Sequence, residues 1–180
     1  MRPVLVKLAT VVLALIGCNT SSAAWAQDPR LEDRVRAAFL YNFARFTQWG
    51  TPHTDQQLGF CVAGDAELLE TLRTTIRGKN IHGHTLLAFD TNIIDIESQC
   101  DVLYVGAQAK PDLLDRVAKG TLLVGEGRGF AQNLGMVGFV LQQDRLRFVI
   151  NPSHVENAGL KLSAELLSLA EIVSPLESSL

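Results

Sequence analysis

Short apolar runs constrain the fold of this chain most strongly. Each has the length and composition of a buried strand, and they cover residues 58–63 (LGFCVA), 100–105 (CDVLYV) and 121–124 (TLLV). Helical segments are predicted between them at 66–76, which Asp65 can cap, and at 111–118, which begins with Pro111. Strands that alternate with helices are typical of a mostly parallel sheet covered by helices.

The two ends of the domain are predicted from periodicity and turn signals. Apolar residues recur at helical spacing over 33–49 and again over 160–173, so a helix is expected in each segment. Residues 136–141 and 145–150 predict a β-hairpin around a polar turn. The predicted fold class is therefore α/β: a single domain with a mostly parallel sheet, a C-terminal antiparallel hairpin, and helices on both faces.

The N-terminus has the layout of a secretory signal peptide. A short basic start precedes an apolar run over 8–16, which is too short to span a bilayer because spanning needs about 20 apolar residues. The motif AWA at 24–26 matches the small-x-small cleavage pattern. Residues 1–26 are therefore predicted to be a signal peptide, and 27–180 an exported, periplasmic domain.

The same segment also allows a lipoprotein. Residues 15–18 (LIGC) resemble a lipobox, in which the cysteine is lipidated and becomes the new N-terminus. A lipid on Cys18 would tether the protein to a membrane leaflet. The AWA motif favours the soluble form, and the lipoprotein stays open as an alternative.

Removal of the signal segment leaves two cysteines, Cys61 and Cys100. An even pair in an oxidising compartment indicates a disulfide bond, and two buried free thiols are the alternative. The bond would close a loop of about 40 residues, for which the chain-entropy model gives about 4 kcal/mol before native-state strain is subtracted.

No catalytic motif emerges from the sequence. It has neither the G-x-S-x-G nucleophile elbow nor a P-loop with its Lys and Ser/Thr. The glycine-rich segment 125–129 runs toward a predicted strand, so it is a connection or, less favoured, an anion-binding loop. His82 and His84 offer half of a metal site without a third ligand nearby, and two solvated histidines are the simpler interpretation. The sequence therefore predicts no enzyme activity, no metal and no cofactor.

Charge and aromatic residues indicate which class of partner the protein binds. The formal net charge is −3 and basic residues are scattered, so a nucleic acid is not expected as a ligand. Phe46 and Trp49 lie at the end of the first predicted helix, where aromatic side chains can dock into another protein. A role in the core is the alternative for both.

Several segments together resemble the YfiR family. They are AAFLYNFARFTQW (37–49), GFCVAGD (59–65), CDVLYVG (100–106), TLLVGEGRGFAQNLGMVGFV (121–140) and RLRFVINPSHVENAGLKLSAELLSLA (145–170). The resemblance implies a periplasmic protein without enzyme activity that restrains a membrane-bound diguanylate cyclase through the cyclase's periplasmic sensor domain. That restraint lowers cyclic di-GMP and biofilm growth. Homodimer formation and small-molecule binding are also associated with the family.

The family also implies roles for individual residues. Cys61 and Cys100 match its bond between the first and third strands, whereas the second cysteine pair of the better-known members is missing here. Candidates for partner binding or a polar pocket match the family's turn before the hairpin, its R-x-R-F-x-I-N stretch and the start of its last helix: Phe130, Met136, Arg147, Asn151 and Lys161. Several have a structural interpretation beside this one, such as Asn151 as a helix cap. A periplasmic small-molecule-binding protein that serves a sensor or transporter is the alternative function.

Overall fold

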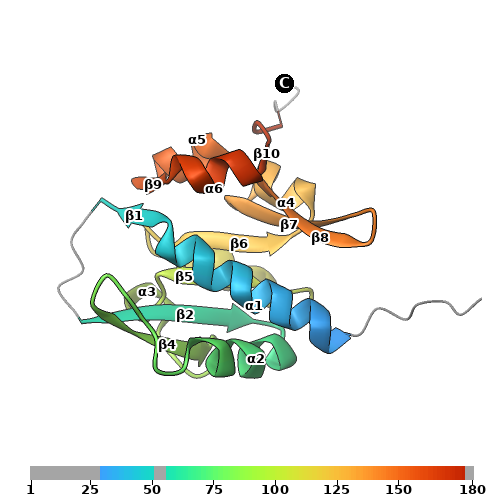
Figure 1. Ribbon diagram of the computed structural model, residues 1–180. Helices are drawn as coiled ribbons and strands as arrows, with labels where there is room; N and C mark the ends of the chain where they lie inside the picture. Colours follow the sequence, from blue (N-terminus) through green and yellow to red (C-terminus); the bar gives the residue numbers. More distant parts are fainter. Residues whose placement is uncertain (1–28, 51–55, 177–180) are drawn as a thin grey trace, which may run out of the picture.

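The computed structural model describes residues 29–50 and 56–176 of the 180-residue chain (Figure 1). The predicted signal peptide, its cleavage site and Cys18 lie outside these ranges. Among the helices inside them, none is long and apolar enough to cross a membrane.

An eight-stranded sheet forms the centre of the protein, in the order β10-β8-β7-β6-β5-β2-β4-β3. Neighbouring strands are parallel except in the hairpins β7–β8 and β3–β4. The strands are β2 (Gln57–Ala63), β3 (Asn80–Ile81), β4 (His84–Asp90), β5 (Val102–Val105), β6 (Leu122–Glu126), β7 (Val137–Gln142), β8 (Arg145–Ile150) and β10 (Glu171–Ile172). The predicted α/β class, with its mostly parallel sheet and C-terminal antiparallel hairpin, is confirmed.

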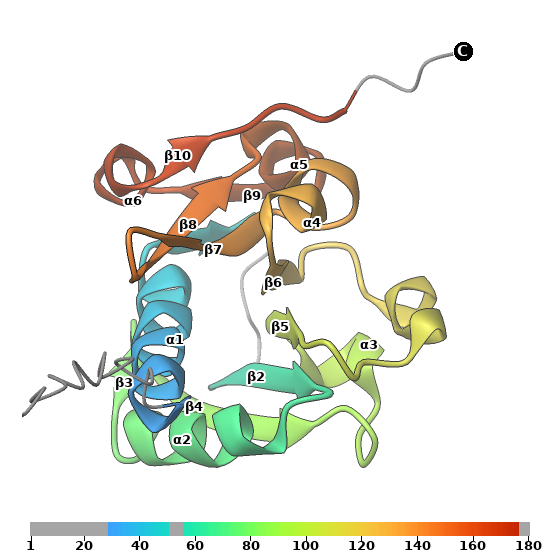
Figure 2. The same ribbon diagram turned by 90° about the vertical axis from the view of Figure 1, so that its right-hand side faces the viewer.

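Helices cover both faces of this sheet (Figure 2). The long helices α1 (Pro29–Arg45) and α2 (Ala66–Ile76) lie on one face, and α3 (Ile96–Gln99) and the 3-10 helix η1 (Pro111–Arg116) lie on the other. The remaining helices are α4 (Arg128–Asn133), α5 (Pro152–Asn157) and α6 (Ala164–Leu169). The prediction for 66–76 is confirmed, and the Asp65 carboxylate accepts a hydrogen bond from the Leu68 amide at 3.0 Å, as an N-cap does.

Two large apolar clusters fill the two faces, and a third, small cluster is built around Ala131, Val149 and Val173. On the α1 side, the fully buried Phe43 ring lies 5.8 Å from Phe139 and 5.0 Å from Phe148, centroid to centroid, and Phe39 completes the aromatic group. On the other side, a smaller cluster is built around Cys61, Cys100, Ile96, Leu103 and Leu113. Successive residues of β2 and β5 belong to one cluster and then the other, because side chains alternate between the two faces along a strand.

The first helix ends earlier than its periodicity predicts. Helix α1 covers Pro29–Arg45, and Thr47–Trp49 form a strand, β1, in a separate two-stranded ribbon with β9 (Leu160–Leu162). The Thr47 hydroxyl donates a hydrogen bond to the Phe43 carbonyl at 2.7 Å, and the next residues take their backbone partners from β9. The prediction of helix through residue 49 was wrong because pairing with a distant segment overrides local periodicity.

The predicted helix over 160–173 was also wrong. That stretch is divided into β9, the short helix α6 and β10. Ser163 ends β9 by capping α6, where its hydroxyl accepts a hydrogen bond from the Leu166 amide at 3.2 Å. Leu169, one of the apolar residues of this segment, is 70% exposed.

Two smaller corrections concern the middle of the chain. The glycine-rich segment 125–129 leads into helix α4 rather than directly into a strand. Gly125 allows this close turn because a Cβ there would lie 2.7 Å from the Phe130 ring. The helix predicted at 111–118 is a shorter 3-10 helix, η1.

Candidate functional site

The ribbon of β1 and β9 brings three of the predicted site residues together. Gln48 lies opposite Lys161 and Trp49 lies opposite Leu160 in its antiparallel register. The Ser163 amide extends the pairing by donating a hydrogen bond to the Phe46 carbonyl at 2.9 Å. The backbones of Phe46 and Trp49 therefore lie close to that of Lys161, although more than half of the chain separates the two strands in sequence. Because side chains alternate along a strand, Trp49 and Lys161 point to opposite faces of the ribbon.

The ribbon presents both apolar and charged groups. Phe46 and Trp49 are half-buried against the main core, and Gln48 and Lys161 are exposed. The Arg45 guanidinium lies 5.5 Å from the centroid of the Phe46 ring, a cation–π distance. Aromatic residues and arginine are enriched at protein interfaces, whereas lysine is depleted there.

Two cavities flank strand β9. The first has a volume of about 380 Å³ and a mostly apolar wall that includes Val155, Leu162 and Leu167, with Lys161 also part of its lining. The second, of about 430 Å³, lies between Trp49 and the residues that precede β5 and β6. Both volumes fall within the range of ligand pockets and could equally receive a side chain from a partner.

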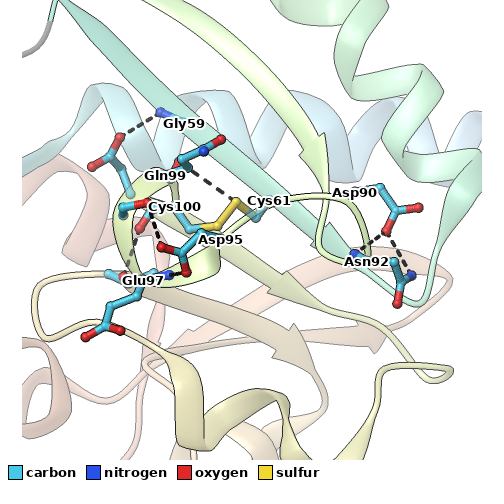
Figure 3. The surroundings of a disulfide bond; sticks show 11 residues. Gly59, Cys61, Asp90, Asn92, Asp95, Glu97, Gln99 and Cys100 are labelled. Atoms are coloured by element: carbon cyan, nitrogen blue, oxygen red, sulfur yellow. Dashed lines mark hydrogen bonds between the residues drawn. A yellow bond between two sulfur atoms is a disulfide. The ribbon is translucent and has the colours of Figure 1, made fainter.

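The disulfide contributes to the second cavity. Cys61 of β2 and Cys100, which precedes β5, are bonded with their Cα atoms 5.6 Å apart, and both are almost fully buried (Figure 3). Cys100 and its neighbour Asp101 both line this cavity. Asp101 accepts a hydrogen bond from the Gly59 amide at 2.6 Å, which joins the same two segments a second time. The bond thus fixes one wall of the cavity beside Trp49.

Phe130, Met136 and Asn151 lie inside the protein at the turn between α4 and β7. The Phe130 ring occupies the space beside Gly135, where a Cβ would be 2.0 Å from it. The fully buried Asn151 donates its side-chain amide to the Ala131 carbonyl at 2.9 Å and caps α5 by accepting from the His154 amide. These three side chains shape the turn in this structure and are not part of the ribbon.

Arg147 lies apart from the other candidates. It is exposed on β8, opposite Val140 in the hairpin register. The predicted site residues thus lie in three separate places. Phe46, Trp49 and Lys161 are at the ribbon, and Phe130, Met136 and Asn151 are near the turn between α4 and β7. Arg147 is on β8.

A polar cluster under α1 was not predicted from the sequence. The Arg36 guanidinium is only 16% exposed and donates to Glu126 at 3.0 Å. The Tyr104 hydroxyl donates to the same Glu126 oxygen at 2.5 Å. Burial, together with this hydrogen bond, raises the pKa of Tyr104 far above its usual value, so the hydroxyl stays a donor. The cluster anchors α1 to the ends of β5 and β6.

Asp33 lies beside this cluster, and its carboxyl makes the stability of the fold depend on pH. Burial raises the pKa of its carboxyl, and the nearby Asp65 adds to the shift while Arg36 opposes it. A carboxyl whose pKa is raised in the folded state favours folding in its protonated form. Its contribution to the stability of the fold is present below the unfolded pKa and is lost as pH rises through the folded pKa. We therefore expect Asp33→Asn to be more stable than the wild type at neutral pH, with a difference that disappears toward pH 4, near the ordinary pKa of an aspartate carboxyl, 3.8.

Urea unfolding at the two pH values measures this difference. Glu165→Gln, at an exposed position on α6, serves as the control and should shift the unfolding midpoint little at either pH. A less stable Asp33→Asn variant at neutral pH would show instead that the contact with Arg36 outweighs the cost of burial.

His82 and His84, at the turn between β3 and β4, contact backbone carbonyl groups. His82 lies 3.3 Å from the Arg45 carbonyl and His84 lies 3.2 Å from the Ile81 carbonyl. Among the residues that the structure describes, no group of three or more His, Cys, Asp or Glu side chains could hold a metal ion.

Comparison with known proteins gives one family. No curated protein matches this chain. The model of the YfiR/HmsC-like family matches residues 33–171, which include both strands of the ribbon and the whole sheet except Ile172 at the end of β10. The family is regulatory and non-catalytic, and its members act in the periplasm on diguanylate cyclases. The chain therefore belongs to the YfiR/HmsC-like family.

Proposed function

We propose that this protein is a non-enzymatic periplasmic repressor. It binds the periplasmic sensor domain of an inner-membrane diguanylate cyclase and so lowers cyclic di-GMP and biofilm formation. Family membership supports the class of function. The observation that carries the binding role is the β1–β9 ribbon, where the chain at Phe46 and Trp49 runs beside Lys161, and Lys161 lines an apolar cavity.

The ribbon has the physical features of a docking surface. Binding energy at protein interfaces concentrates in a few aromatic and apolar anchors that fill pockets, surrounded by polar residues. Here the cavity lined by Val155, Leu162 and Leu167 can receive an apolar side chain of the cyclase. Lys161 in the lining of this cavity favours an acidic group on the partner.

The first test is genetic. Deletion of the gene in the source bacterium should raise cellular cyclic di-GMP, and the wild-type gene should restore the low level. Unchanged cyclic di-GMP after deletion, with a cyclase shown to be expressed, would contradict the repressor.

The second test locates the interface. Lys161→Glu and Phe46→Ala should each weaken binding of the cyclase's periplasmic domain by about tenfold or more, because they remove a charge contact and an aromatic anchor. The matched control is Arg77→Glu, which reverses an exposed cation away from the ribbon. Titration of purified sensor domain measures the affinities, and cyclic di-GMP in complemented cells measures repression. Wild-type affinity in both ribbon variants would place the interface elsewhere.

A second candidate function is small-molecule binding in the service of a sensor or transporter. The cavity of about 430 Å³ beside Trp49 favours it, since its volume suits a metabolite. Saturable binding of a metabolite without effect on cyclic di-GMP would favour this function. Homodimer formation is proposed with either role, and the mass of the protein in solution tests it.

A further inference from the structure

A polar cavity of about 190 Å³ lies at the carboxyl ends of three parallel strands, on a different edge of the sheet from the ribbon. Its walls include Gly64 after β2, Thr91 and Asn92 after β4, and Gln108, Lys110 and Arg116 after β5. None of these residues belongs to a catalytic or ligand-binding motif recognisable in the sequence.

The topology explains why a cavity forms there. Strands β2 and β5 are parallel neighbours, but the chain leaves β2 for α2 on one face and leaves β5 for η1 on the other. The two connections diverge and open a crevice outside the carboxyl ends of the strands. Ligands of open α/β sheets bind at such switch points.

The loops around the cavity are held against each other. Gly64 has a φ of +69°, and a Cβ at this position would lie 2.2 Å from the Ala109 backbone nitrogen. The loop after β2 therefore touches the loop after β5 backbone to backbone, which only glycine permits. Ile94, Ala109 and Leu113 at the cavity belong to the apolar cluster that contains the disulfide. The cavity is thus preformed on a cross-linked base.

The residues that line the cavity favour a ligand with a negatively charged group. Lys110 and Arg116 form no salt bridge within residues 29–50 and 56–176, and Asp112 is the one carboxylate among the cavity residues. The amide nitrogen of Asn92 donates to Asp90 at 2.9 Å, which orients the side chain at the cavity (Figure 3). Arginine and lysine are the side chains that bind carboxylate and phosphate most strongly.

We propose that this cavity binds a small metabolite that carries a carboxylate or phosphate group, with Lys110 and Arg116 as its oxyanion ligands. The cavity is smaller than the roughly 300–1,000 Å³ of sites for drug-sized ligands. The ligand is therefore of about amino-acid size. This site is independent of the repressor function, because it shares no residue with the ribbon.

Calorimetric titration of the purified, oxidised protein tests the site. Orthophosphate and succinate are the probes, and sodium chloride at matched ionic strength is the control for screening. We expect saturable binding of at least one probe, and the stronger of the two identifies phosphate or carboxylate chemistry. Lys110→Gln and Arg116→Gln should each weaken that binding by at least about tenfold, since each removes a charge-assisted hydrogen bond.

The matched control is Arg77→Gln, which removes an exposed cation from outside the cavity and should bind like the wild type. The proposal is overturned if neither probe binds saturably beyond sodium chloride. It is also overturned if Lys110→Gln and Arg116→Gln bind as tightly as the wild type, or if Arg77→Gln loses as much affinity as they do. The cyclase is absent from this experiment, so its outcome leaves the repressor function to the tests above.

Discussion

Replacing Cys61 with serine should lower the free energy of unfolding by about 2–4 kcal/mol under oxidising conditions. The bond joins β2 to the residue before β5 across a sequence separation of 39, so its loss releases a long loop in the unfolded chain. Both sulfurs lie in the smaller apolar cluster, which would also lose a packed cross-link. Chemical denaturation of the wild type and of Cys61→Ser, each with and without reductant, measures the effect.

Reduced wild type is the matched control for this variant. It should unfold at about the midpoint of Cys61→Ser, and reductant should leave the variant unchanged. If the proposed repressor function holds, the same variant should also repress the cyclase less well, because Cys100 lines the cavity beside Trp49. Equal midpoints for oxidised wild type and Cys61→Ser would show that the bond does not stabilise the fold.

Phe43→Ala should cost about 3–5 kcal/mol, the range for loss of a buried aromatic ring. The ring is fully buried and lies within 6 Å, centroid to centroid, of Phe39, Phe139 and Phe148. Its removal leaves a cavity between α1 and the hairpin, and the neighbouring rings cannot close it without leaving their own contacts. The midpoint of thermal or denaturant unfolding measures the loss.

Phe46→Ala on the same stretch of chain is the control. Phe46 is only partly buried, so the cost in stability should be well below that of Phe43→Ala. A Phe43→Ala variant as stable as Phe46→Ala would contradict the assignment of Phe43 to the centre of the core. Comparison of these two variants also separates an effect on stability from an effect on binding, because of the two residues only Phe46 is proposed to contact the cyclase.

The accuracy of the sequence predictions follows the range of the interactions. Helix 66–76 was predicted correctly because its signals are local: an Asp65 cap, a helical apolar period and Gly78 after its end. The β7–β8 hairpin was predicted for the same reason, since its turn lies between its strands. Residues 47–49 and 160–162 were assigned to helices because their partner strands lie far away in sequence.

The candidate site shows the same limit. The sequence named Phe46, Trp49 and Lys161 one by one, but only the register of the ribbon brings their backbones close together. The polar cluster around Arg36 was missed because its partner Glu126 is 90 positions away in sequence. The switch-point cavity was missed because Lys110 and Arg116 form no sequence motif, and strand order alone brings them beside Gly64.

The pairing of β1 with β9 also affects how the chain can fold as it is made. A polypeptide emerges from its N-terminus, so β1 and the aromatic face of α1 appear long before β9, Phe139 and Phe148. Until the last strands arrive, the rings of Phe39 and Phe43 lack their partners on β7 and β8 and remain exposed to aggregation. Contacts of such long sequence separation also slow folding. The aromatic face of α1 can therefore be fully covered only after the final segment has emerged.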